Sequence, residues 1–331
     1  MHDDMPGEGQ DALLRVMSLA VTAISILCAG LISIPLGVGW DLYNLTFVSG
    51  VIAPWLLLAM LKLSRPTLTS LGLCALLLTV LVTTIFSCGA VAIMSTRSPV
   101  PLGDALLQRL DGALGLSAEA FVTTVASGPQ WVIDGLHLVY ASTTPLTLLT
   151  LVALPLMGQA RAALRFMLLF QLTLLCCALI AFLLPAYGAF TTIDLATTAR
   201  LPDGAGRFFW AALTGFRSAA DPVVSVESLG AVVSFPSFHT VVALLLVQAW
   251  HKVRLVNLAM LATSALIIVS TLPMGGHYFA DVIAGTILWW GCSCLLRSVL
   301  RSRSMPIVPR RSTQLRLGLP SPSLSKTSSP A

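Results

Sequence analysis

Two histidines and an aspartate stand where apolar segments begin, in a chain of 331 residues that has only five histidines. His277 precedes Asp281 by four residues, so the two side chains share one face if the segment is helical. A carboxylate in that place holds one imidazole nitrogen and leaves the other free to attack or to accept a proton. His239 follows Ser237 by two residues at the start of another apolar run. Together the two histidines predict phosphoryl transfer on a lipid.

Phosphoryl transfer needs a nucleophile, a proton donor for the leaving oxygen, and donors that stabilise the equatorial oxygens. We expect His277 to attack phosphorus and form a phosphohistidine, while Asp281 fixes its tautomer. His239 is the expected general acid and then general base. Ser237 offers a hydroxyl group. Backbone N–H groups at the starts of the two helices, with Gly276 allowing close approach, are expected to hold the anion.

The composition is that of a membrane protein. Hydrophobic residues make up 56% of the chain and charged residues 10%, with a mean hydropathy of +0.89, whereas a soluble chain carries roughly 25% charged residues. The basic residues lie in short loops and a tail, so the pI of about 9.0 does not indicate nucleic-acid binding. All seven cysteines lie in apolar runs, which indicates packing rather than disulfides. No metal-binding spacing occurs, and we expect neither a metal site nor another cofactor.

Eight apolar runs approach or exceed the ~20 residues that a spanning helix needs. They are 14–36, 42–62, 70–94, 136–157, 163–187, 238–251, 254–273 and 277–299. The predicted fold is therefore an all-α, polytopic transmembrane bundle. The first run has an acidic flank and no clear cleavage site, so we interpret it as a retained helix rather than a signal peptide.

The charges of the loops predict the orientation. With both termini in the cytoplasm, three short inner loops carry basic residues and no acidic ones, and the acidic residues gather in the outer loops. The basic residues of the inner loops are Lys62, Arg65, Arg161, Arg165, Lys252 and Arg254. This orientation puts His239 and His277 on the outer side, which is the periplasmic face if the membrane is a bacterial inner membrane.

Two outer segments are long. Residues 95–135 contain the run Leu102–Asp111, whose apolar spacing predicts either an amphipathic helix on the membrane surface or a solvated linker helix. Residues 188–236 lead directly into the first histidine motif. We divide the chain into a three-span N-terminal segment, an outer segment, a catalytic membrane core, and a basic cytoplasmic tail that is expected to be disordered. Their boundaries are 1–95, 96–135, 136–300 and 301–331.

Two motifs resemble those of the type 2 phosphatidic acid phosphatase superfamily, which shares a helical core with vanadium haloperoxidases. Ser234-Phe-Pro-Ser-Phe-His239 resembles its second motif, and Gly276-His-Tyr-Phe-Ala-Asp-Val-Ile-Ala-Gly285 resembles its third. The resemblance covers about residues 136 to 299. It implies a helical core of the same kind and an enzyme that acts on a lipid phosphate.

The resemblance also implies a role for each residue that matches the motifs. His277 is then the nucleophile, Asp281 its partner, His239 the acid and base, and Ser237 a phosphate ligand. Ser270 stands at the start of the third motif, as in the family.

Three departures from the family pattern bear on the phosphate. Phe238 stands where the second motif has glycine, and Thr271 stands where the third motif has a phosphate-binding arginine. The first motif, a lysine followed by Arg-Pro, is not recognisable. Three arginines of the preceding outer segment are candidates for the missing charge: Arg200, Arg207 and Arg217.

The pattern is closer to the inositolphosphorylceramide synthase branch, whose members transfer a phosphoinositol head group to ceramide. The rings of Phe238, Tyr278 and Phe279 are expected to make the mouth of the site apolar and dry, which favours transfer over hydrolysis. A phosphodiester, with one negative charge, also fits the missing arginine better than a monoester does. The substrate is thus expected to be a membrane phospholipid or sphingolipid.

Other functions remain open at this point. One is a lipid phosphate monoesterase of the phosphatidic acid phosphatase type. Another is a non-catalytic transporter or lipid-binding protein whose histidines are structural or sense pH. A vanadate-dependent oxidase fits less well, because the phosphate-binding arginine is missing. The sequence indicates neither the lipid nor the oligomeric state.

Overall fold

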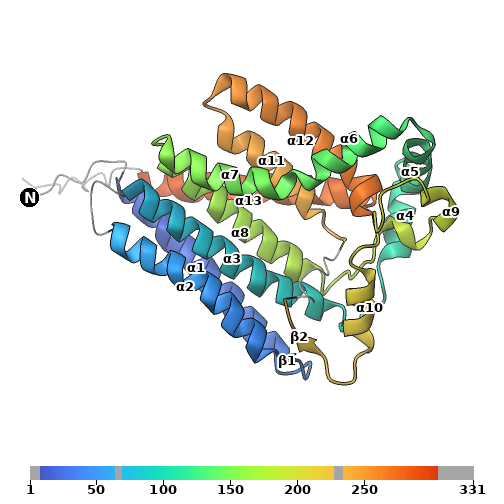
Figure 1. Cartoon of the computed structure of the whole chain (residues 1–331), viewed down its shortest axis with the longest axis horizontal. Coiled ribbons are helices and arrows are strands. Elements are labelled where there is room, and N and C mark those ends of the chain that lie inside the picture. Colours follow the sequence, from blue (N-terminus) through green and yellow to red (C-terminus); the bar gives the residue numbers. More distant parts are fainter. Residues whose placement is uncertain (1–7, 64–68, 227–233, 305–331) are drawn as a thin grey trace, which may run out of the picture.

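A computed structural model describes residues 8–63, 69–226 and 234–304 as a bundle of long helices (Figure 1). The long helices are α1 (Glu8–Ser33), α2 (Leu42–Leu63), α3 (Thr69–Ser95), α6 (Gln130–Ala141), α7 (Thr143–Leu156), α8 (Ala160–Ile180), α11 (Phe238–Trp250), α12 (Arg254–Gly275) and α13 (Phe279–Ser304). The predicted tail lies outside the described residues from position 305 onward.

Shorter elements cover one end of the bundle. They are α4 (Asp104–Ala113), α5 (Ala118–Ser127), the 3-10 helix η2 (Ala189–Thr191), α9 (Leu195–Thr198), α10 (Trp210–Ser218), β1 (Gly39–Trp40) and β2 (Val223–Val224). The two strands pair in parallel, with Gly39 opposite Val223. They join the α1–α2 turn to the segment that precedes the first histidine motif.

The chain is a polytopic, all-α integral membrane protein, as predicted. Five helical stretches among the described residues are long and apolar enough to cross a membrane, and α6 with α7 makes a sixth if the bent pair is one span. Those five are Gly9–Ser33, Thr69–Ser95, Ala160–Ile180, Arg254–Gly275 and Phe279–Ser302. The count of eight spans is not confirmed, and α11, on the predicted run 238–251, has only 13 residues.

The predicted run 136–157 is two helices that meet at Ser142 with a bend of 40°. Pro145 explains the break, because it has no N–H to donate to the carbonyl of Ala141 and its ring clashes with that group. The Ser142 hydroxyl instead donates to the carbonyl of Val139 at 2.6 Å. Helix α6, which packs on α12, thus ends one residue after Tyr140, whose ring contacts His239 of α11. The predicted run 163–187 is also too long, since α8 ends at Ile180.

A buried polar network ties the N-terminal helices to the rest of the bundle. Gln171 of α8 donates to the hydroxyls of Thr22 on α1, at 2.7 Å, and Thr84 on α3, at 3.1 Å. The Ser18 hydroxyl of α1 donates to the side-chain oxygen of Gln171. Buried polar groups in a membrane bundle need such partners. The network therefore fixes how α1 and α3 sit against α8.

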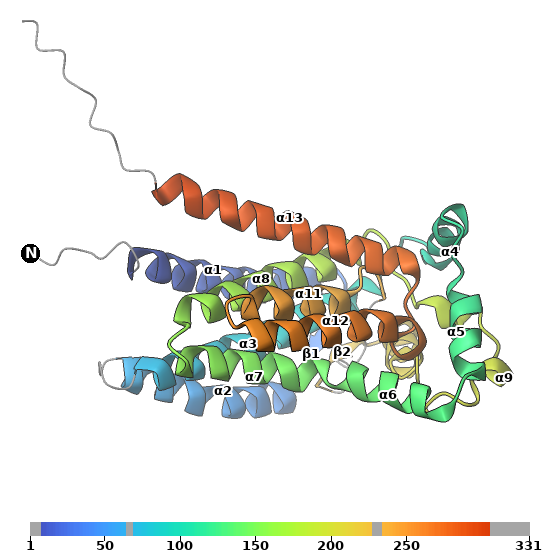
Figure 2. The same cartoon turned by 90° about the horizontal axis from the view of Figure 1, so that it is seen from above.

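The loops predicted to be inner and outer lie at opposite ends of the bundle. The start of α1, the α7–α8 turn and the C-terminal end of α13 share one end, and α4, α5, α9 and α10 share the other (Figures 1 and 2). We refer to these as the basic end and the histidine end. The arrangement agrees with the predicted alternation of loops, while the end that faces the cytoplasm stays a prediction.

Helix α4 differs from both structures expected for it. Asp104, Leu107 and Asp111 form one buried face of this helix, against η2 and the start of α13. Leu106 and Leu110, on the other side, are 42% and 45% exposed. The helix is thus neither a free linker nor only a surface helix, because its polar face is packed into the protein.

Candidate active site

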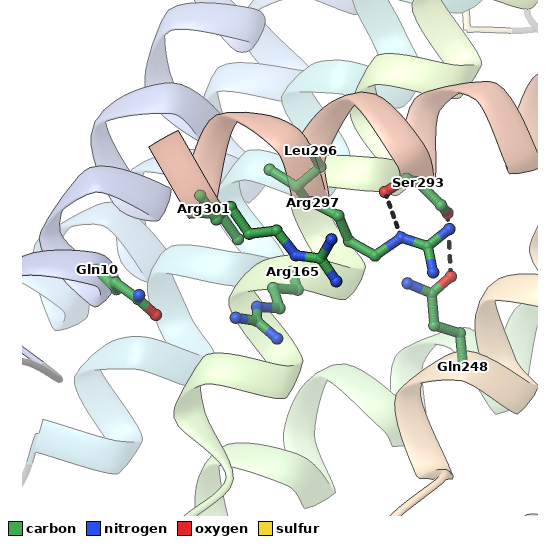
Figure 3. Close-up of a pocket in the computed structure, with 8 residues that line it drawn as sticks. Gln10, Arg165, Gln248, Ser293, Leu296, Arg297 and Arg301 are labelled. Carbon is green, nitrogen blue, oxygen red and sulfur yellow. Dashed lines mark hydrogen bonds between the residues drawn. The ribbon is translucent and has the colours of Figure 1, made fainter. Parts of the chain in front are cut away.

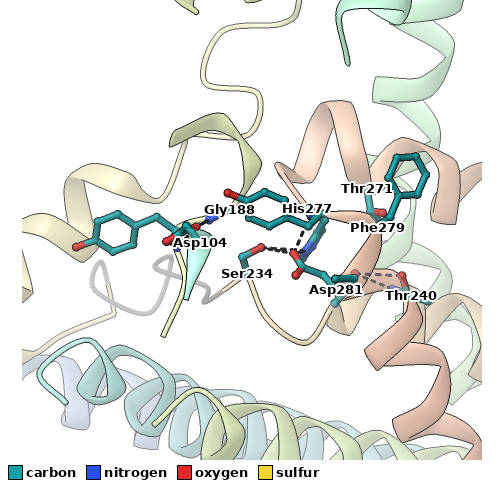
Figure 4. A network of polar contacts seen from close by, with 12 residues as sticks. Asp104, Gly188, Ser234, Thr240, Thr271, His277, Phe279 and Asp281 are labelled. Atoms are coloured by element: carbon teal, nitrogen blue, oxygen red, sulfur yellow. Dashed lines mark hydrogen bonds and ion pairs between the residues drawn. The ribbon is translucent and has the colours of Figure 1, made fainter. Parts of the chain in front are cut away.

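His277 lies in the turn between α12 and α13, not on a helix (Figure 4). Helix α12 ends at Gly275, and Gly276 has a φ of 74°, the left-handed conformation that glycine adopts most easily. The predicted sharing of one helical face is therefore wrong in its geometry. The contact nevertheless forms, because Asp281 in the first turn of α13 reaches back to His277, with Nδ1 and Oδ2 3.0 Å apart.

The Asp281 carboxylate is the centre of the polar network in Figure 4. Its Oδ2 accepts hydrogen bonds from the Ser234 hydroxyl at 2.5 Å and from the Tyr278 N–H at 3.0 Å, besides its contact with His277. Its Oδ1 is buried without a partner. Asp281 is fully buried and His277 only 4% exposed. An Nδ1–H held in this way leaves Nε2 of His277 with its lone pair free.

His239, in the first turn of α11, is the neighbour of His277 in space. The centroids of the two imidazole rings are 6.4 Å apart, with an angle of 61° between their planes. The Tyr140 ring, at the end of α6, stacks on His239 at 4.5 Å. Reacting atoms sit about 3 to 3.5 Å apart before a transfer. The two rings are therefore close enough to contact the same bound group.

Ser237 and Ser270 were expected to bind the phosphate, but the hydroxyl of each forms hydrogen bonds within its own helix. Ser237 caps the N-terminus of α11, and its hydroxyl accepts from the N–H of Thr240 at 3.4 Å and from the Thr240 hydroxyl at 3.1 Å. The Ser270 hydroxyl donates to the carbonyl of Ile267 at 2.7 Å. Both serines are fully buried. Ser234, which opens the same motif as Ser237, places its hydroxyl on the histidine–aspartate pair, whereas Ser237 donates only its backbone N–H to the Asp281 carbonyl, at 3.1 Å.

The outer segment 188–236 is bonded to the turn between α12 and α13, next to Gly276. The Gly276 carbonyl accepts from the N–H of Ala189 at 2.7 Å, and the Met274 carbonyl accepts from the N–H of Gly206 at 2.8 Å. A Cβ on Gly276 would lie 2.7 Å from the Gly206 carbonyl oxygen, and a Cβ on Gly188 would collide with the Gly276 carbonyl. The absence of a side chain at Gly276 thus lets the backbone of Gly206 approach it closely, whereas the sequence predicted that the phosphate would approach there.

Two carboxylates of α4 hold the same region from the other side. Asp104 accepts from the N–H of Gly188 at 2.7 Å and of Tyr187 at 3.1 Å. Asp111 accepts from the N–H groups of Phe279 and Ala280, at 3.0 and 2.8 Å, in the first turn of α13. The amides of α13 expected to hold an anion are therefore bonded to Asp111. Burial raises the pKa of both carboxyls, and these hydrogen bonds lower it by less.

Neither Asp104 nor Asp111 was predicted from the sequence to belong to the site. They lie seven residues apart, two helical turns, with Leu107 between them on the same face. This spacing could have indicated that the two aspartates are buried, because it puts both carboxylates on the same face of the helix as Leu107. Tyr140 carried no comparable signal, since its contact with His239 depends on the bend at Ser142.

The three candidate arginines donate hydrogen bonds to backbone carbonyls of the two outer segments, 95–135 and 188–236. Arg200, Arg207 and Arg217 donate to the carbonyls of Ala126, Ile193 and Thr96, at 3.1, 2.7 and 2.8 Å respectively. The Arg207 guanidinium also lies over the ring of Trp210 at 5.3 Å, and its Nε is buried without a partner. Arg200 and Arg217 thus join segment 188–236 to segment 95–135, and Arg207 bonds within segment 188–236.

The three rings expected at the mouth of the site lie in different places. Phe238 packs edge-on against Phe170 at 5.0 Å and lines an apolar cavity beside His239. Tyr278 is 1% exposed, with its hydroxyl 3.4 Å from that of Thr191. Phe279 packs edge-on against Phe121. Of the three rings, only Phe238 lines this cavity. Tyr278 contacts segment 188–236 and Phe279 contacts segment 95–135.

The model of the PAP2 superfamily matches residues 105–295, more than half of the chain. The chain belongs to the PAP2 superfamily, the type 2 phosphatidic acid phosphatase superfamily that the two motifs predicted. The match runs from α4 into α13 and includes both histidine motifs, and it leaves out α1, α2 and α3. No curated protein and no solved structure matches the chain. Membership of this superfamily supports a phosphoesterase of the lipid phosphatase type.

Proposed function

We propose that this PAP2 membrane protein cleaves or transfers a lipid-linked phosphate ester through a phosphohistidine on His277. The observation that carries the proposal is the pair of imidazoles, one of them held by a buried carboxylate. His277 Nδ1 is 3.0 Å from Asp281 Oδ2, and the ring of His239 is 6.4 Å from that of His277. A non-catalytic transporter has no need of this arrangement.

The reaction has two steps. Nε2 of His277 attacks phosphorus, the phosphorus–nitrogen bond forms, and the bond to the leaving oxygen breaks as His239 gives that oxygen a proton. In the second step His239 takes a proton from water or an alcohol, whose oxygen attacks phosphorus and releases His277. Asp281 stabilises the positive imidazole that forms in between, and Ser234 orients Asp281.

Arg207 is our candidate for the positive charge at the phosphate. Its chain neighbour Gly206 bonds to Met274 and contacts Gly276, beside the reactive histidine. The unpartnered Nε of Arg207 also has a donor to offer. Arg217 bonds to Thr96 at the end of α3 and is the second candidate. Ser237, Ser270 and the Gly276 amide are weaker candidates, because their polar groups already have partners.

We further propose that the enzyme prefers transfer of a head group, as inositolphosphorylceramide synthases do, over hydrolysis of a phosphomonoester. Phe238 and the apolar cavity beside His239 favour a dry site that admits a lipid alcohol. Thr271, in place of the motif arginine, leaves less positive charge than a doubly charged monoester needs. We also propose that the histidine end faces the periplasm, with both termini in the cytoplasm.

The test compares two substrates offered to the purified enzyme. Phosphatidylinositol with ceramide is the phosphodiester and acceptor pair, and phosphatidic acid is the monoester. We expect a phosphoinositol–ceramide product in excess over inorganic phosphate, and no product of either kind from His277→Ala. Inorganic phosphate alone, with no transfer to any alcohol, would leave the superfamily's lipid phosphatase function and overturn the preference for transfer.

A further inference from the structure

An apolar cavity of about 400 Å³ lies directly beside His239. Its walls come from α3, α7, α8 and α11, and from Phe235 and Pro236 ahead of α11. Most of its lining is aliphatic or aromatic, and it includes Phe238 and His239, so the cavity reaches the proposed acid and base. Small-molecule sites in proteins have volumes of this size, about 300 to 1,000 Å³.

The depth of the cavity equals that of one leaflet. Along α3 the lining runs from Leu81 to Ala92, which at 1.5 Å per residue is about 16 Å. The hydrocarbon core of a bilayer is about 30 Å thick, so one leaflet contributes about half of that. Since α3 ends at Ser95, at the histidine end, the cavity extends from the middle of the bundle to the level of the site.

The cavity opens sideways toward the surroundings of the bundle. Ile85 on α3 and Leu148 on α7 both line it, and they are 45% and 41% exposed. On a membrane-spanning segment, exposed apolar side chains meet lipid rather than water. The gap between α3 and α7 is therefore a route by which a lipid chain enters without leaving the hydrocarbon layer.

One wall of this cavity is outside the part of the chain that matches the superfamily. The match starts at residue 105, whereas six lining residues belong to α3. Gly89 and Ala92 are the smallest of these, and they leave room where larger side chains would fill it. The Gln171 network fixes α3 against α8, so this wall is held in place.

We propose that one hydrocarbon chain of the lipid substrate lies in this cavity, and that α3 selects the chain. The proposal rests on the proposed function for the identity of the lipid as a substrate. With the chain against Gly89 and Ala92, its head group reaches His239 and His277. Binding then strengthens with each methylene group that the cavity buries, and the N-terminal helices determine lipid specificity.

The first experiment locates the chain without requiring turnover. The full-length His277→Ala protein, in phosphatidylcholine vesicles, is photolabelled with phosphatidic acid that carries a diazirine midway along one acyl chain. We expect labelled peptides from α3 and α7, and about tenfold less α3 labelling when Gly89→Leu or Ala92→Leu is added. The matched control is Ala23→Leu, at an exposed position of α1, which should leave the pattern unchanged.

The second experiment measures specificity in the active enzyme. The ratio of kcat/KM for dioleoyl to dihexanoyl phosphatidic acid should fall about tenfold in Gly89→Leu and stay constant in Ala23→Leu. Labelling spread evenly over lipid-facing helices, and unaffected by either α3 substitution in folded protein, overturns the proposal. If no lipid phosphate is turned over, the proposed function fails, and the labelling still decides whether the cavity holds a chain.

Discussion

Both ends of the bundle contain a group of polar side chains, and the two groups differ in charge. At the histidine end, Asp281, Ser234 and His277 form a buried network with no arginine in it. At the basic end, a pocket of about 290 Å³ is lined by Arg165, Arg297 and Arg301, together with Gln248 and Ser293 (Figure 3). Arg297 lies eighteen residues, about 27 Å, along α13 from the start of the helix at Phe279, beside His277.

The cluster of three arginines therefore lies at the end opposite the proposed reactive site. The guanidinium of Arg297 donates to the Ser293 carbonyl at 3.1 Å, and the Ser293 hydroxyl donates to Gln248. Such an arginine-lined end fits the basic side of a membrane protein. The histidine end has the proposed nucleophile, His277, and the carboxylate that contacts it, Asp281, and phosphoryl transfer through a phosphohistidine requires such a pair.

The largest expected difference between the ends is in turnover. His277→Ala should lower kcat/KM by at least about 1,000-fold, because it removes the nucleophile. Asp281→Asn should lower it less, since the imidazole remains but its orientation is weakened. Arg297→Ala, at the other end, should change it by less than about threefold. Steady-state assays of purified, folded variants on one lipid phosphate make the comparison.

Near-normal activity of His277→Ala would contradict the nucleophile assignment. A loss in Arg297→Ala as large as that in His277→Ala would instead put the chemistry, or a step that limits it, at the basic end.

A smaller effect is expected from Asp111, which holds the first turn of α13. Asn has one acceptor oxygen for the two amides that Asp111 bonds, so Asp111→Asn should cost about 1 kcal/mol of stability. The displaced turn should also lower kcat more than it raises KM. Asp203→Asn, at an exposed position, is the control and should do neither.

The pH dependence of this variant has a defined sign. Burial raises the pKa of Asp111, so the folded protein binds that proton more tightly than the unfolded chain does. This contribution to stability is complete below the pKa of an unfolded aspartate, about 3.9, and is lost as the pH rises through the raised value. Thermal unfolding of Asp111→Asn in detergent should therefore vary less with pH across this window. An unchanged slope would mean that Asp111 does not titrate there.

The third prediction concerns which end faces the cytoplasm, and it involves no change in activity. In a variant with the seven native cysteines replaced by alanine, Asp203→Cys should react with an impermeant thiol reagent added to intact cells. Met157→Cys, in the exposed turn between α7 and α8, should react only after the cells are opened. The loop charges are the physical reason. The reverse pattern would put the histidine end in the cytoplasm.

The fold was largely readable from the sequence because its signals are local. Each of the eight apolar runs overlaps a helix, or the pair α6 and α7, because apolar length alone predicts such segments. The ends differ, as at α8, which stops at Ile180. The histidine motifs were visible for the same reason. His277 and Asp281 are four residues apart, so their contact needs only one turn of chain.

The rest of the site depends on contacts between distant parts of the chain. Asp111 bonds to Phe279, 168 residues away, and Asp104 bonds to Gly188, 84 residues away. The hydroxyl of Ser234 rather than that of Ser237 bonds to the Asp281 carboxylate, because the Ser237 hydroxyl caps α11. Ser237 reaches Asp281 only through its backbone N–H, which donates to the Asp281 carbonyl at 3.1 Å. Local patterns hold no information about such pairings. They follow from how α4 and the outer segment pack over the start of α13.

The most direct test of the account is to trap the covalent intermediate. A lipid labelled with radioactive phosphorus is mixed with the enzyme, the reaction is stopped in alkali, where phosphohistidine is stable, and the labelled peptide is identified. The account predicts acid-labile label on the peptide that contains His277, more of it in His239→Ala if the second step slows, and none in His277→Ala. Turnover without any labelled peptide, or label that persists in His277→Ala, would contradict it.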